Sequence, residues 1–163
     1  MAKSKAKATG AVELLKEQHD KVKKAFKEFE KFDREDTEGQ QQLVQSVCED
    51  LKLHTTLEEE LFYPAAREAI EDEDLLNEAQ IEHETAKMLI EQLENMGPDD
   101  PNFHATFKVL GEYVMHHVKE EEGEMFPQVK KTDLDLEELG ARMRSRMEEL
   151  MGAPEEEEEK EKN

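Results

Sequence analysis

The stretch HTTLEEELFYP at residues 54–64 decides the fold, together with its near copy HVKEEEGEMFP at residues 117–127. The two segments align without a gap, and another histidine lies upstream of each. The matching positions are 63 residues apart: His54 and His117, Glu58 and Glu121, and Pro64 and Pro127. The upstream pair, His19 in QHD and His83 in EHE, is 64 residues apart. The chain therefore reads as two helical hairpins, each of which contributes a histidine and then an HxxxE motif.

Apolar residues recur at alternating steps of three and four, and strand-like alternation is absent, which predicts an all-α, up-down-up-down four-helix bundle. The four apolar stripes run from Val12 to Phe29, from Val47 to Leu61, from Leu76 to Leu93 and from Phe103 to Met125. Turns are expected at Gly39 and at Gly97, Pro98 and Pro101. Pro64 should kink or interrupt the second helix near Tyr63.

The chain is expected to have four parts. Residues 1–10 form a disordered basic arm, 11–131 the bundle, 132–152 a C-terminal amphipathic helix and 153–163 an unstructured acidic tail. One face of the C-terminal helix carries Leu136, Leu139, Met143, Met147 and Leu150. This helix either packs on the bundle or meets a protein partner, and Gly152 and Pro154 should end it.

Composition excludes several classes of function. A formal charge of −21 over 163 residues disfavours a nucleic-acid partner and an anionic membrane surface. We find no long apolar run and no secretory signal, and no phosphate loop or nucleophile triad. The single cysteine, Cys48, fits a reducing compartment, so we expect a soluble cytoplasmic protein.

Polar residues occupy the predicted core and need a common explanation. Six of them lie on the apolar stripes: His19, His54, Glu58, His83, His117 and Glu121. Burying two carboxylates without partners would cost several kcal/mol each, whereas imidazole and carboxylate groups are ordinary metal ligands. In each HxxxE motif the two residues lie about 6 Å apart along one helix face, so the histidine can bind one metal while the glutamate reaches a second. The repeat predicts two metals, each with two histidines, bridged by both glutamates.

Several alternatives remain at this point. The thiolate-free N/O ligand set fits iron best, then manganese, with zinc a lesser candidate. The order of His before Glu, four residues apart, argues against a ferritin-type site, which uses ExxH. His116 forms its own i,i+4 pair with Glu120 and competes with His117, although the stripe and the repeat favour His117. Glu59 and Glu122 are expected to be solvated or to support the ligands.

Over residues 12–130 these motifs resemble the hemerythrin family, specifically its HHE cation-binding branch. The resemblance implies a non-haem di-iron centre (Fe2+/Fe3+, with an oxo or hydroxo bridge) that binds dioxygen. His19 and His54 would serve one iron and His83 and His117 the other, with Glu58 and Glu121 bridging. Two departures disfavour simple oxygen carriage. Lys87 stands where oxygen carriers have a further histidine, and a glutamate four residues after the last histidine replaces an aspartate five residues after it.

These departures direct the expectation to a di-iron protein that binds, senses or reacts with dioxygen, nitric oxide or peroxide. Weak peroxide or oxidase chemistry at the same centre is an enzymatic alternative. Iron storage or donation, including iron–sulfur repair, is an alternative without turnover. An acidic helical interaction module that docks through its C-terminal helix and tail is the alternative without a metal.

Overall fold

The computed structural model describes residues 10–162, with side chains for residues 10–152. All regular elements in this range are helical, which confirms the predicted fold class. They are α2 (Ala11–Lys31), α3 (Thr37–Leu57), η1 (Glu58–Phe62), α4 (Tyr63–Ala69), α5 (Glu73–Glu94), α6 (Phe103–Glu120), η2 (Glu121–Met125), α7 (Phe126–Lys130) and α8 (Leu136–Lys162). The elements η1 and η2 are single turns of π-helix. The predicted arm at residues 1–10 lies almost entirely outside the described residues.

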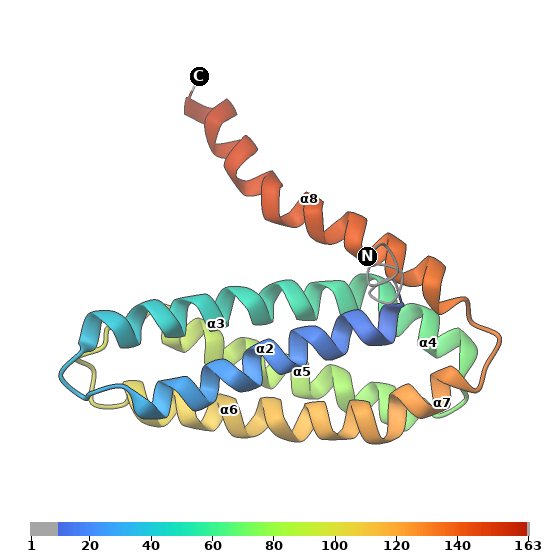
Figure 1. Cartoon of the computed structure of the whole chain (residues 1–163), viewed down its shortest axis with the longest axis horizontal. Coiled ribbons are helices and arrows are strands. Elements are labelled where there is room, and N and C mark those ends of the chain that lie inside the picture. Colours follow the sequence, from blue (N-terminus) through green and yellow to red (C-terminus); the bar gives the residue numbers. More distant parts are fainter. Residues whose placement is uncertain (1–9, 163) are drawn as a thin grey trace, which may run out of the picture.

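Four rods make up the bundle. Elements α3, η1 and α4 follow one another without a break, as do α6, η2 and α7, and α2 and α5 are the other two rods. Helices α2 and α5 each contact both α3 and α6. The α2–α3 and α5–α6 connections lie at one end of the bundle, and the α4–α5 and α7–α8 connections lie at the other (Figure 1). This is the predicted up-down-up-down arrangement.

Side-chain caps fix where the helices begin. The Asp36 carboxylate accepts a hydrogen bond from the Gly39 N–H at 3.0 Å and caps α3, and Asp72 caps α5 in the same way. The prediction that Gly39 lies in the turn is therefore wrong, because Gly39 belongs to the first turn of α3. A Cβ at this position would lie 2.6 Å from the Asp36 carboxylate, so glycine leaves room for the cap. The turn predicted at residues 97–101 is confirmed between α5 and α6.

The two prolines of the repeat follow the two π-turns. In each turn a backbone N–H bonds to the carbonyl five residues earlier, Tyr63 to Glu58 and Phe126 to Glu121. Pro64 and Pro127 come next and have no N–H to donate, so the backbone there cannot form the usual α-helical hydrogen bond. The predicted interruption at Pro64 is confirmed, and π-turns of this kind are frequent at functional sites.

A polar layer divides the core into two apolar clusters. One cluster lies toward α4, α7 and α8 and includes Leu15, Leu57 and Phe62. The other extends toward the α2–α3 turn and includes Val22 and Leu51. His19 falls between Leu15 and Val22 on α2, and His54 falls between Leu51 and Leu57 on α3. Apolar packing on both sides therefore holds the polar layer away from water.

Helix α8 packs on the end of the bundle, as one of the two predicted alternatives required. Leu139 and Met143 are buried in the first apolar cluster, and Met147 and Leu150 pack partly against it. Gly152 and Pro154 do not end the helix, whose backbone is helical to Lys162. The helix bounds thus differ from the expected end at residue 152, because the Glu and Lys residues that follow have high helix propensity. The side chains of the predicted tail, from residue 153, lie outside the described residues.

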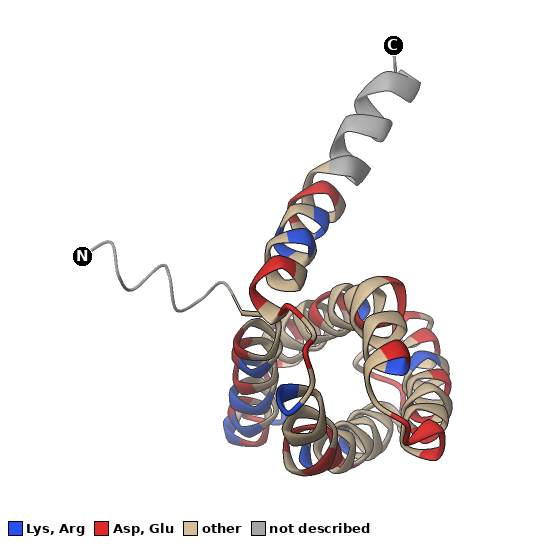
Figure 2. Ribbon diagram, turned by 90° about the vertical axis from the view of Figure 1, so that its right-hand side faces the viewer, with Lys and Arg blue, Asp and Glu red and all other residues tan. Residues whose placement is uncertain are grey.

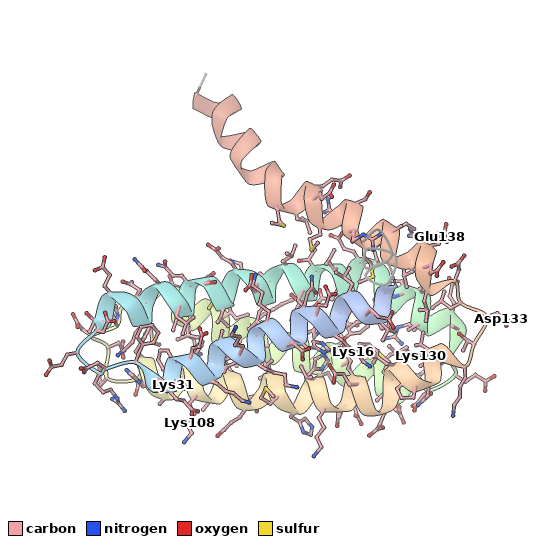
Figure 3. All side chains as sticks on the ribbon, in the orientation of Figure 1. Lys16, Lys31, Lys108, Lys130, Asp133 and Glu138 are labelled. Atoms are coloured by element: carbon pink, nitrogen blue, oxygen red, sulfur yellow. The ribbon has the colours of Figure 1, made fainter. Side chains whose placement is uncertain are left out.

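Charged residues cover the outside of the bundle. Asp and Glu are distributed over all four rods with Lys and Arg between them (Figure 2), and Lys31 and Lys108 extend away from the bundle into solvent (Figure 3). Within the described residues, no helix combines the length and apolar character needed to cross a bilayer.

Cys48 should be inert while the protein is folded. Its side chain is buried, and burial, with the nearby Glu94 carboxylate, raises the pKa of the thiol to about 12. At pH 8 only about one thiol in 10⁴ would then be ionised, and the thiolate is the reactive form. We expect an aromatic disulfide reagent to titrate no thiol in the native protein and one per chain in guanidinium. Rapid labelling of the native chain would contradict this burial.

Candidate metal centre

The structure brings all six predicted residues into one buried layer. His19 comes from α2, His54 from α3, Glu58 from η1, His83 from α5, His117 from α6 and Glu121 from η2. Each is between 0 and 8% exposed. The i,i+4 spacing places each glutamate one turn beyond its own histidine, at the start of a π-turn.

The six residues form two overlapping groups of four. One contains His19 and His54, the other contains His83 and His117, and Glu58 and Glu121 belong to both. Within each group the four donor atoms all lie within 4.8 Å of one another.

Each glutamate turns one oxygen toward each group. For Glu58, Oε2 lies 3.1 Å from His54 Nε2 and Oε1 lies 2.8 Å from His83 Nε2. For Glu121, Oε1 lies 3.1 Å from His19 Nε2 and Oε2 lies 3.0 Å from His117 Nε2. Both carboxylates therefore have the geometry of bridges between two cation positions.

The opposite ring nitrogen of every histidine has its own hydrogen-bond partner. The Nδ1 atoms of His19, His54, His83 and His117 contact Glu122 at 2.8 Å, Gln18 at 2.6 Å, Glu59 at 2.8 Å and Glu82 at 2.7 Å, respectively. Such acceptors hold the ring proton on Nδ1 and leave Nε2 free to bind a cation. Glu59 and Glu122 thus support the histidines, which was one of their two predicted roles.

Gln18 and Glu82 were missed in the sequence. Each directly precedes an upstream histidine, in QHD and EHE, yet supports the histidine of a neighbouring helix. The 64-residue offset between these two positions was the available signal, although it does not say which ring they contact.

Four atoms of the first group have no hydrogen-bond partner. They are His19 Nε2, His54 Nε2, Glu58 Oε2 and Glu121 Oε1. The His–Glu contacts at 3.1 Å bring these atoms together without the alignment of a hydrogen bond. An unsatisfied buried polar group costs about 1–3 kcal/mol, and one cation would satisfy all four, so the donor set fits a metal.

In the second group, the Tyr63 hydroxyl lies among the donor atoms. It is 3.0 Å from Glu58 Oε1 and 3.1 Å from both His83 Nε2 and His117 Nε2, and it hydrogen-bonds to Glu121 Oε2. Burial, followed by the Glu121 and Glu58 carboxylates, raises the pKa of Tyr63 well above 10. The sequence assigned Tyr63 only to the helix interruption, so its place in the site is new.

The metal-free site holds protons on its histidines. Burial opposes protonation of His117, but Glu121, Glu58 and Glu82 outweigh it and raise the pKa well above 6.5. The pKa values of His19 and His83 are also raised, because Glu121 and Glu58 outweigh their burial. In Glu58, neighbouring His54, His117 and His83 outweigh burial and lower the pKa well below 4.5. Protons therefore occupy nitrogens that a cation would need.

His117, rather than His116, faces the core. The His116 side chain is 62% exposed and contacts Glu120 at 3.1 Å and Glu82 at 3.6 Å on the surface. Lys87 lies beside the site, because its Nζ contacts Glu59 Oε1 at 2.8 Å, but it belongs to neither group of donor atoms.

A small apolar cavity adjoins the four histidines. It has a volume of about 30 Å³, more than the 10–15 Å³ or so that one water molecule needs. Its apolar lining comes from Val22, Leu51, Ala86, Val114 and Val118.

An antiparallel bundle with two overlapping His/Glu groups in its core defines a helical cation-binding protein. The family model for the hemerythrin HHE cation binding domain matches residues 10–129. The chain belongs to this family, as its motifs indicated.

A solved structure and a curated protein are similar to the chain. The crystal structure of a hemerythrin HHE cation binding domain-containing protein from Mycobacterium kansasii is 28% identical, with a TM-score of 0.75 and 88% of each chain covered. A DNA nickase from Nostoc is 29% identical over 118 residues, which are 72% of this chain and 33% of that protein. The match thus spans about a third of the curated relative.

Proposed function

We propose that the protein holds two iron ions in its core, one between His19 and His54 and one between His83 and His117, with Glu58 and Glu121 as bridges. The observation that carries this proposal is that each glutamate presents one oxygen to each histidine pair. The four unpartnered atoms of the first group and membership of a cation-binding family support it. Nitrogen and carboxylate ligands without thiolates favour iron over manganese and zinc.

The site is suited to a small ligand. When bound, iron supplies redox chemistry and a coordination position for an exogenous molecule. The apolar cavity beside the histidines is large enough for a diatomic molecule and too small for an organic substrate. We therefore propose that the cytoplasmic protein binds, senses or reacts with dioxygen, nitric oxide or peroxide. Iron storage is the second candidate, because a two-metal site can serve it without turnover.

Nucleic acid is not part of this proposal. The name DNA nickase belongs to a protein of which this match is a third, and a net charge of −21 opposes contact with phosphates.

Anaerobic purification with ferrous iron, followed by metal analysis and visible spectroscopy, tests the proposal. We expect about two irons per chain, as the two donor groups require, and charge-transfer absorption when air is admitted. A spectrum that changes reversibly with dioxygen or nitric oxide would indicate binding, and peroxide consumption would indicate catalysis. Iron that is taken up and released with no such response would support storage. A folded chain that binds no metal would contradict both.

A further inference from the structure

We propose that Tyr63 is a seventh ligand, which binds through its phenolate oxygen to the metal between His83 and His117 and makes the two metal positions chemically different. This inference rests on the proposed di-metal function and adds a ligand that the HxxxE motifs do not contain.

The position of the hydroxyl is the first argument. Tyr63 Oη lies within 3.1 Å of three donor atoms of the second group, Glu58 Oε1, His83 Nε2 and His117 Nε2, and also contacts the fourth, Glu121 Oε2. A hydroxyl has one proton and can donate only one hydrogen bond. It therefore cannot satisfy both carboxylate oxygens, whereas one cation at this place would satisfy them and the phenolate together.

The internal repeat provides the second argument. The counterpart of Tyr63 in the other half is Phe126, 63 residues later. The Phe126 ring stacks on the His19 ring, with centroids 6.0 Å apart and planes 4° apart, and offers no ligand atom. The four donor atoms without a hydrogen-bond partner all belong to this Phe126 half. Every polar contact that breaks the symmetry of the repeat at this level thus lies on the His83–His117 side.

The backbone explains why Tyr63 can reach the site. At 100° per residue, an α-helix would point Tyr63 about 140° away from Glu58. The π-turn Glu58–Phe62 widens the helix there, and the Tyr63 N–H bonds to the Glu58 carbonyl. Glutamate and tyrosine consequently share one face, and Tyr63 is 5% exposed.

The ligation step is balanced without a change in oxidation state. The phenol O–H bond breaks, the oxygen–metal bond forms, and the proton leaves to solvent. An anionic oxygen favours the ferric over the ferrous ion, so the His83–His117 position should hold the more oxidised metal. The His19–His54 position, which has one ligand fewer, is then the one open to an exogenous molecule.

Visible absorption and resonance Raman spectroscopy of the iron-loaded full chain test this proposal. Ferric iron bound to a phenolate absorbs in the visible, and excitation in that band should enhance tyrosine ring vibrations in the wild-type protein. The chain contains two tyrosines. Tyr63→Phe should therefore lose the band and the ring vibrations while still binding iron. Tyr113→Phe, at a side chain that is 43% exposed, should keep both.

The outcomes separate the two proposals. Wild-type protein with two irons and no tyrosine vibrations would overturn the ligand and leave the di-iron site intact. Retention of the band in Tyr63→Phe would overturn it as well. A chain that takes up no iron would overturn the ligand together with the proposed function. The wild-type Raman spectrum decides the question even if the Tyr63 variant fails to fold.

Discussion

Replacing Glu58 with glutamine should lower the iron content from about two per chain to one or less. Its carboxylate is fully buried and gives one oxygen to each donor group. An amide removes the negative charge and one of the two metal-binding oxygens, so both positions lose a ligand. The loss of affinity should exceed the roughly 10–100-fold cost of removing a partner that only orients a ligand. Metal analysis after dialysis against a weak chelator measures it.

The sequence supplies matched controls in the next two residues. The side chains of Glu58, Glu59 and Glu60 are 0%, 26% and 45% exposed. Glu59 orients His83 through Nδ1, so Glu59→Gln should weaken metal binding by only about 10–100-fold. Glu60 pairs with Arg146 on the surface, and Glu60→Gln should leave the iron content unchanged. Equal losses in all three variants, or tight binding of two irons by Glu58→Gln, would contradict the assigned bridge.

Metal-free and metal-loaded protein should respond to pH in opposite directions. In the metal-free protein the pKa values of His19, His83 and His117 are raised above 6.5. Their stabilisation is fully present below pH 6.5 and is lost as pH rises through the raised values. The pKa values of Glu58 and Glu121 are lowered from 4.5, so their stabilisation is present above pH 4.5 and is lost as pH falls through the lowered values. The metal-free chain should thus be most stable between pH 4.5 and 6.5.

Metal binding needs neutral imidazole, so the loaded protein should gain stability as pH rises toward 8. At a free metal concentration of 100 times Kd, binding contributes about 2.7 kcal/mol, which raises Tm by about 5–11 °C for a chain of this size. Anaerobic calorimetry at pH 5.5, 7 and 8, with and without ferrous iron, should show the Tm difference widening with pH. A difference that stays constant with pH would argue against histidine ligation.

Local patterns in the sequence account for most of the bundle. The apolar stripes depend on the 3.6-residue period, which each helix satisfies within its own backbone, and the four rods form where the stripes run. The six donor residues could be found in the same way. A buried histidine or glutamate on an apolar stripe is conspicuous, and the 63-residue repeat selects the right ones, including His117 over His116.

Other features depend on contacts that no local pattern contains. Gly39 was expected to lie in a turn, because its role depends on the space beside Asp36. Gln18 and Glu82 support histidines on neighbouring helices, so their partners depend on how the rods are aligned.

The sequence by itself determined the class of fold and the donor set, because helix period, repeat and residue chemistry are local properties. Only the tertiary structure decided which oxygen faces which histidine and that α8 covers one end of the core. It also decided that the Tyr63 hydroxyl lies among the donors of one group while Phe126 lies beside the other. The reason for the last is the π-turn, which rotates Tyr63 onto the face of Glu58, whereas any prediction based on a 3.6-residue period places it elsewhere.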